Sequence, residues 1–274
     1  MHVNRLLALA ASTLLSACAS HLNAPAETVS VPDTGFRTTT GITYSPDSWP
    51  QELQADLYLP DSPDPAPAVL LVHGGGWERR SRKDMTWIAE HLAGRGFAVM
   101  NIDYRFAPEH TFPAQLHDLQ IAMNWLHARA GAYNLDRNAI SAFGFSSGAH
   151  LVSLLAVIAE SQHPLNQPHG GADARPEAVV AGGLPANLRT FGSGKLIRQF
   201  LGGDQQDIPG VYEAASPITH ITAGTPPFFL FHGAQDMLVP ADQARDFRAR
   251  LAEHHVESEL YLMHLRGHIT SFLT

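Results

Sequence analysis

The sequence predicts an α/β domain in which a mostly parallel central sheet is flanked by helices. Short apolar runs alternate along the chain with longer amphipathic stretches, which is the pattern of strands joined by crossover helices. The run Ala68–His73 is apolar up to its last residue, as a strand buried on both faces of a parallel sheet requires. With 274 residues, 45% hydrophobic and 16% charged, the chain has enough apolar material for one large globular domain.

The individual elements follow from the same pattern. The short apolar runs expected to be strands are Thr39–Tyr44, Leu53–Leu59, Ala68–His73, Ala98–Ile102, Ile140–Phe145, Val179–Gly182, Phe228–His232 and Leu260–Met263. The longer stretches expected to be helices are Asp84–Ala93, Ala114–Ala130, Gly148–Ile158 and Ala241–Leu251. The second of these helices follows Pro113, which suits a first helical turn, and stops at Gly131.

The N-terminus is predicted to be a lipoprotein signal peptide over residues 1–17. Arg5 gives it a basic start, and the apolar run Leu6–Leu15 is shorter than the roughly 20 residues that cross a bilayer. The segment Leu15-Ser16-Ala17-Cys18 resembles a bacterial lipobox. That resemblance implies cleavage before Cys18 and a diacylglycerol on its sulfur, so the partner would be a membrane. An ordinary signal peptide with an incidental cysteine is the alternative.

Residues 18–38 are expected to be a lipidated tether, because they are rich in Ala, Ser, Thr and Pro and show no periodicity. The catalytic body would then occupy residues 39–274. Cys18 is the only cysteine, so no intramolecular disulfide is possible. Ala19 follows it instead of the aspartate associated with inner-membrane retention. The expected location is therefore the bacterial cell envelope, on the outer membrane and facing the periplasm.

Charge and histidine spacing argue against two classes of ligand. The formal net charge of −8 opposes binding to nucleic acid, because both partners would be negative. His254-His255 and the pair His163 and His169 lack the spacing that zinc sites use. We therefore expect no nucleic-acid partner, no metal and no cofactor.

The segment Gly144-Phe145-Ser146-Ser147-Gly148 is a candidate nucleophile turn. A strand is expected directly before it and a helix directly after it, and so sharp a turn needs glycine on both sides. Ser146 would then lie at the carboxyl edge of the sheet, above a helix N-terminus that stabilises developing negative charge. Ser147 is expected to contribute its backbone N–H. A Gly/Ser-rich turn without catalytic function is the alternative.

The segment His73-Gly74-Gly75-Gly76-Trp77 follows a buried strand. Successive glycines let the backbone turn and aim its N–H groups at a ligand, which is the requirement for an oxyanion hole. A flexible loop is the alternative. His73 is expected to be structural, and Trp77 is a candidate wall of an acyl or aromatic pocket, with simple packing as its alternative.

Two further groups complete a candidate triad. Asp236 follows the strand Phe228–His232, and His268 follows the last expected strand. The chain order Ser, Asp, His is that of one class of α/β enzymes, in which the histidine takes the serine proton and the acid orients its ring. The rival groups are Asp242 at a helix start, Glu213 before a strand and His264 without an adjacent glycine.

The sequence is similar to the esterase branch of the α/β-hydrolase fold, close to hormone-sensitive-lipase-like carboxylesterases and to feruloyl- or acetylxylan-esterase-like enzymes. The similarity covers about Leu53 to His268. The motifs that carry it are Asp56-Leu57-Tyr58-Leu59-Pro60, the His-Gly-Gly-Gly-Trp segment, Asp103-Tyr104-Arg105-Phe106-Ala107-Pro108-Glu109-His110, Gly-Phe-Ser-Ser-Gly-Ala-His at 144–150, and Ser216-Pro217. The resemblance implies the triad Ser146, Asp236 and His268, and an oxyanion hole formed by Gly75, Gly76 and Ser147.

Two departures from that family pattern matter. Hormone-sensitive-lipase-like enzymes usually have Asp where this chain has Phe145. They also have an N-terminal helical cap, for which the tether leaves little room. Both differences favour similarity to the feruloyl-esterase-like enzymes, with an open active site. Phe145 thereby becomes a second, weaker substrate-binding candidate beside Trp77. The chain also stops six residues after His268, where the family adds a covering helix. We expect that helix to be missing, one sheet face to be partly bare, and the position of His268 to be affected.

The predicted function is hydrolysis of small-molecule carboxylic esters through an acyl-enzyme on Ser146. Two alternatives remain open from the sequence. The same triad can act on amide or peptide bonds, or the body can be a degenerate hydrolase that serves as a surface-anchored binding protein.

Overall fold

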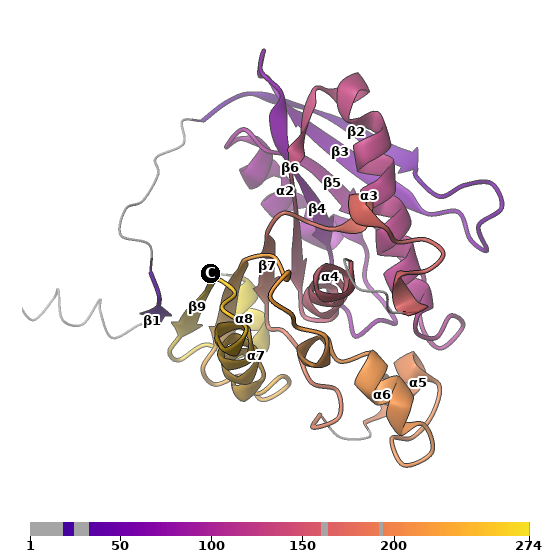
Figure 1. Cartoon of the computed structure of the whole chain (residues 1–274). Coiled ribbons are helices and arrows are strands. Elements are labelled where there is room, and N and C mark those ends of the chain that lie inside the picture. Colours follow the sequence, from indigo (N-terminus) through magenta and orange to yellow (C-terminus); the bar gives the residue numbers. More distant parts are fainter. Residues whose placement is uncertain (1–18, 25–32, 160–163, 192–193, 274) are drawn as a thin grey trace, which may run out of the picture.

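The computed structural model describes residues 19–24, 33–159, 164–191 and 194–273, and these form one nine-stranded sheet in the order β1-β9-β8-β7-β6-β4-β5-β3-β2 (Figure 1). The strands are β1 (Ala19–Leu22), β2 (Phe36–Thr43), β3 (Gln54–Pro60), β4 (Ala66–Val72), β5 (Ala98–Ile102), β6 (Leu135–Phe145), β7 (Val179–Gly182), β8 (Phe228–Gly233) and β9 (Ser258–Met263). The run from β5 through β4, β6, β7 and β8 to β9 is parallel. The predicted mostly parallel sheet is confirmed.

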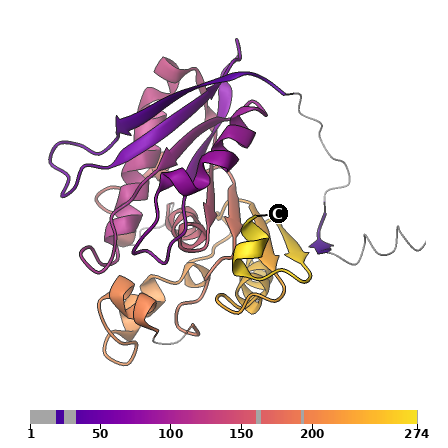
Figure 2. The same ribbon diagram turned by 180° about the vertical axis from the view of Figure 1, so that it is seen from behind.

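Helices cover both faces of this sheet. They are α2 (Thr86–Ala93), α3 (Ala114–Tyr133), α4 (Ser147–Ile158), α5 (Lys195–Leu201), α6 (Pro209–Ala214), α7 (Asp242–Glu253) and α8 (His268–Phe272). Figures 1 and 2 show α3, α4 and α7 on one face and α2 and α8 on the other. The four predicted helices are present. Sequence periodicity missed α5 and α6, because seven and six residues are too short to display a helical repeat.

The core divides into two clusters, one on each face of the sheet. Successive side chains of a strand point to opposite faces, so Leu70 and Val72 of β4 join the cluster under α3, α4 and α7, whereas Leu71 joins the cluster under α2. All three side chains are fully buried. Burial on both faces explains why β4 reads as a continuous apolar run.

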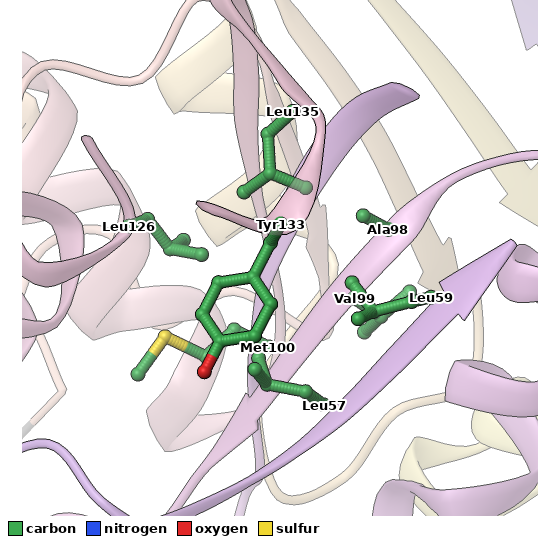
Figure 3. A pocket seen from close by; sticks show the side chains of 8 residues that line it. All are labelled: Leu57, Leu59, Ala98, Val99, Met100, Leu126, Tyr133 and Leu135. Atoms are coloured by element: carbon green, nitrogen blue, oxygen red, sulfur yellow. The ribbon is translucent and has the colours of Figure 1, made fainter. Parts of the chain in front are cut away.

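Apolar side chains of β3, β5 and α3 meet in a tight seam of the larger cluster. Figure 3 shows the ring of Tyr133, at the end of α3, lying against side chains of these strands. The space between them has no room for a water molecule. This indentation is therefore packed core and not a ligand site.

A buried ion pair fixes the loop after β5. Arg105 pairs with Asp118 of α3 at 2.7 Å, and the indole N–H of Trp49 donates to the same carboxylate at 2.8 Å. The loop thereby places Ala107, whose N–H donates to the carbonyl of Trp77 at 2.9 Å. The Asp-Tyr-Arg-Phe-Ala-Pro motif is thus a structural support for the glycine-rich loop after β4.

The prediction of an unstructured tether over residues 18–38 is wrong at its two ends, where the structure has strands. Residues 19–22 form β1, which pairs antiparallel with β9, and β2 begins at Phe36. Without β1, strand β9 would present unpaired N–H and C=O groups at the sheet edge, and a short polar segment satisfies them. The predicted signal peptide and Cys18 lie outside the described residues. None of the helices in the described part of the chain is long and apolar enough to cross a membrane.

The C-terminal helix that was expected to be missing is present as the five-residue α8. Its Phe272 ring packs 4.5 Å from Phe145 and 5.7 Å from Trp87 of α2. So short a helix covers only part of the sheet, and a largely apolar pocket of about 280 Å³ remains beside it, lined among others by Phe231 and Tyr261. The expected absence of a C-terminal helix is therefore corrected: a short helix packs here, beside an apolar pocket.

Candidate active site

Ser146 occupies a strained turn between β6 and α4. Its backbone has φ 55° and ψ −120°, a conformation that a residue other than glycine holds only where its surroundings impose it. The flanking glycines are required by close backbone contacts. A Cβ on Gly144 would stand 2.3 Å from the backbone of Gly148, and one on Gly148 would stand 2.2 Å from the carbonyl oxygen of Val72. The turn therefore presents the Ser146 hydroxyl at the carboxyl edge of the sheet.

The structure brings Ser146, Asp236 and His268 together, as predicted. Ser146 follows β6, Asp236 follows β8 and His268 follows β9, so all three lie at the same edge of the parallel sheet. Nε2 of His268 is 2.8 Å from the Ser146 hydroxyl, and its Nδ1 is 2.6 Å from Oδ2 of Asp236. Both the acid and the histidine are buried. This arrangement can withdraw a proton from the serine.

Hydrogen bonds keep Asp236 ionised. Burial alone would raise the pKa of this carboxyl, but donation from His232, His268 and the N–H of Val239 outweighs it and holds the pKa well below its usual range. Oδ1 accepts the N–H groups of Leu238 and Val239 at 2.9 and 2.8 Å. Oδ2 faces Nδ1 of His268 at 2.6 Å and Nε2 of His232 at 3.4 Å. Asp236 is therefore an anion at neutral pH with its orientation fixed by the backbone.

The ring of His268 is confined by its neighbours. The Phe145 ring lies 5.0 Å from it, and a Cβ on Gly183 would stand 2.9 Å from its Cε1. The Phe145 ring is held in turn by Phe272 of α8. The short α8 thus still supports the histidine, and the expected disturbance of His268 is not present.

The glycine-rich loop after β4 lies beside the nucleophile turn, because β4 and β6 are neighbours in the sheet. A Cβ on Gly74 would stand 3.1 Å from Cβ of Ser146. Gly75 and Gly76 have φ +127° and +66°, which turns their peptide groups. Within the described residues, the N–H groups of Gly75, Gly76 and Ser147 donate to no protein acceptor. They are available to an oxyanion.

The structure places both candidate substrate-binding side chains, Trp77 and Phe145, in buried packing, which was the alternative for Trp77. Trp77 is 4% exposed, with its ring stacked 4.5 Å from Phe200 of α5 and its indole N–H donating to His150 at 3.2 Å. Phe145 is 5% exposed and lies between His268 and Phe272. Both rings support the site from behind. The sequence did not reveal this, because the α5 segment that covers Trp77 is distant in the chain.

Three other histidines lie near the site. The sequence analysis assigned a structural role to one of them and did not consider the other two. His73 is structural, as expected: its ring is buried, stacks 4.5 Å from Tyr104, and its Nδ1–H donates to the carbonyl of Gly74 at 2.6 Å. His150 and His232 were missed as functional neighbours. The one available signal was their proximity in sequence to Ser146 and Asp236, four residues away in each case.

The residues considered as alternatives to the acid and the base of the triad lie elsewhere. Asp242 begins α7, is exposed and pairs with Arg245 at 2.8 Å. His264 bonds to the Ser20 hydroxyl of β1 at 2.8 Å. Glu213 lies in α6. Among the described residues none of these three contacts Ser146 or His268, which leaves Asp236 and His268 as the partners of the serine.

Acidification from pH 7.5 to 5.5 is expected to lower the free energy of unfolding. Burial lowers the pKa of both His117 and His150 to about 4, with His169 and Arg105 adding to the effect at His117. The unfolded chain, with histidine pKa values of about 6.5, binds more protons than the folded protein in this range, so stability present above pH 6.5 is lost as the pH falls toward 4. Urea unfolding at pH 7.5, 6.5 and 5.5 measures this.

The matched variant for that experiment is His150→Asn, which should lose less stability than wild type over the same interval. Equal wild-type stability at pH 7.5 and 5.5 would contradict the prediction.

Comparison with known proteins identifies relatives of this fold and site. A family model described as BD-FAE matches residues 55–251. Esterase LipC of Mycobacterium tuberculosis is 35% identical over 196 residues, which cover 68% of this chain and 48% of that protein. The chain spans about half the length of the curated relatives it matches.

Two solved structures are also similar. A truncated form of a carbohydrate esterase from gut microbiota has a TM-score of 0.80 at 24% identity, covering 89% of this chain and 94% of that one, and shares the fold. A propionate-bound esterase from the planctomycete Thermogutta terrifontis has a TM-score of 0.69 at 25% identity, covering 86% of this chain and 85% of the other.

Proposed function

Because the chain belongs to the BD-FAE family, we propose that it is a serine hydrolase that cleaves carboxylic esters. The observation that carries this proposal is the unbroken hydrogen-bond chain from Ser146 through His268 to Asp236, at 2.8 and 2.6 Å. The name of the relative LipC, an esterase, supports the choice of an ester as substrate. The free N–H groups of the glycine loop beside the serine supply the second component that acyl transfer needs.

In the proposed reaction, the Ser146 oxygen attacks the ester carbonyl carbon while its proton passes to Nε2 of His268. Asp236 accepts the Nδ1–H of the same ring, which leaves Nε2 free to act as the base and stabilises the imidazolium that forms. The negative charge on the carbonyl oxygen is met by the N–H groups of Gly75, Gly76 and Ser147. The dipole of α4 adds to this stabilisation.

Collapse of the tetrahedral intermediate breaks the bond to the alcohol, which takes its proton from His268 and leaves an acyl group on Ser146. Water then attacks the acyl carbon and gives a proton to His268. The second intermediate expels the Ser146 oxygen, which recovers that proton, and the carboxylic acid departs. The cycle returns all three side chains to their starting protonation states.

The proposed substrates carry a short acyl group. Leu196 of α5 is half-buried against the oxyanion loop, and a Cβ on Gly76 would stand 3.1 Å from its Cδ1. In this proposal the acyl group extends past the Leu196 side chain, which limits its length. The propionate held by the Thermogutta terrifontis esterase supports the same size class.

The purified protein is expected to hydrolyse p-nitrophenyl acetate with the highest kcat/KM in a panel of acetyl, butyryl, octanoyl and feruloyl esters. Initial rates for each ester measure this directly. A protein inert toward the whole panel would refute ester hydrolysis, whereas a preference for octanoyl or feruloyl esters would refute only the short-acyl assignment.

A lipid anchor on Cys18 is proposed from the sequence pattern alone. Strand β1 begins at the next residue, Ala19, so an acylated Cys18 would hold the body close to a membrane through the β1 edge of the sheet, in the outer membrane of a bacterial envelope. Cells expressing the full chain and fed a palmitate analogue should yield labelled wild type and unlabelled Cys18→Ser. Label that persists in the variant would refute the anchor.

A further inference from the structure

We infer that His150 is a positioning residue for the oxyanion hole, acting from helix α4 through the side chain of Trp77. The inference rests on the proposed function, because it concerns the same hydrolytic site. In the described structure the His150 ring contacts none of the side chains of Ser146, Asp236 and His268. Its effect on catalysis would be exerted through the backbone of the glycine loop.

The first step of the argument is the backbone of that loop. Gly75, Gly76 and Trp77 have φ angles of +127°, +66° and +60° in succession. Glycine adopts such angles freely, but a tryptophan does not. The carbonyl carbon of Gly76 is bonded to the nitrogen of Trp77, whose backbone conformation is disfavoured. Contacts made by Trp77 must therefore hold that conformation in place.

The second step is what holds Trp77. Its carbonyl accepts the N–H of Ala107 at 2.9 Å, its ring stacks on Phe200 at 4.5 Å and 11°, and its indole N–H donates to Nδ1 of His150 at 3.2 Å. The stack fixes the plane of the ring. The hydrogen bond is the directional contact that fixes its rotation within that plane.

The third step is that His150 is itself locked. It is fully buried, and its Nε2 lies 2.7 Å from the carbonyl of Ala215. An indole N–H only donates and a carbonyl only accepts, so both bonds form only in the tautomer with Nδ1 bare and Nε2 protonated. The backbone N–H of His150 donates to the carbonyl of Ser146 at 3.0 Å, one turn after the nucleophile. One ring thus ties the nucleophile helix to the oxyanion loop.

Three substitutions separate the two bonds of this ring. His150→Gln places an amide donor near the former Nε2 and removes the acceptor for Trp77. His150→Asn places an amide oxygen near the former Nδ1 and keeps that acceptor. Trp77→Phe removes the indole N–H and keeps the stack on Phe200. The control is Trp125→Phe, another buried tryptophan, which stacks on Tyr133 of α3.

For p-nitrophenyl acetate, His150→Gln and Trp77→Phe are expected to lower kcat by roughly tenfold to a hundredfold, because donors displaced from the oxyanion lose much of their effect. KM should change little. Affinity for an aryl trifluoromethyl ketone, which forms an oxyanion on the serine, should fall by the same factor as kcat. His150→Asn should retain most of the activity, and Trp125→Phe should match wild type.

The double variant Trp77→Phe/His150→Gln should be no slower than the slower single variant, since both changes remove one bond. Circular dichroism and urea unfolding establish that each variant is folded. Folded variants with wild-type kcat and ketone affinity would overturn the inference, and so would additive losses in the double variant. If Ser146→Ala retained activity, the proposed function itself would fail, which is a distinct result.

Discussion

Replacing Ser146 by alanine is expected to lower kcat for p-nitrophenyl acetate by at least about 10⁴-fold, because among the described residues no other hydroxyl is hydrogen-bonded to the His268 ring. The Ser146 hydroxyl has His268 as its hydrogen-bond partner at 2.8 Å. Removing it leaves the oxyanion donors and the fold in place. The residual rate should be that of an enzyme that binds and polarises the ester without attacking it.

The matched control is Ser62→Ala, which removes an exposed hydroxyl that donates to the carbonyl of Asp64 and should leave the rate unchanged. A fluorophosphonate should label wild type once, on the peptide that contains Ser146, and should not label the Ser146→Ala protein. Activity of the variant within tenfold of wild type, or a label on another residue, would refute the assignment of the nucleophile.

Replacing Asp236 by asparagine is expected to lower kcat by about 10³- to 10⁴-fold. Oδ1 of Asp236 accepts the N–H groups of Leu238 and Val239, so the amide oxygen of the variant must take that place. The amide nitrogen then faces Nδ1 of His268 and donates to it. The ring is left with its proton on Nε2, where it cannot accept the proton of Ser146.

Asp242→Asn is the control for this variant, since Asp242 is exposed at the start of α7 and pairs with Arg245. Steady-state rates and urea unfolding of both variants separate a wrong tautomer from a damaged fold. An Asp236→Asn protein that keeps a tenth or more of the wild-type kcat would show that the carboxylate does not set the tautomer of His268.

Local sequence was sufficient for most of the sheet. A strand buried on both faces shows itself as an apolar run, and β4 and β5 therefore appear in the sequence within one or two residues of their ends. Gly144 is similarly local, because a Cβ there would stand 2.3 Å from the backbone of Gly148 in the same turn. Such features need no knowledge of distant segments.

Pairings between distant segments were not predicted. Strand β1 has four residues, too few to display an alternating pattern, and it becomes a strand only because β9 offers an unpaired edge. The short α5 and α6 carry no readable period. Their position decides that Trp77 is buried against Phe200 instead of facing a substrate.

The sequence by itself determined that Ser146, Asp236 and His268 follow strands of one parallel sheet, and a parallel sheet necessarily brings the carboxyl ends of its strands to one edge. Only the tertiary structure decided how these groups are held: Asp236 by two backbone N–H groups, His268 by Phe145, and the oxyanion loop by Trp77 and His150. The physical reason is that the position of each strand along the chain follows from short-range patterns, whereas the orientation of a side chain depends on contacts between residues far apart in the chain.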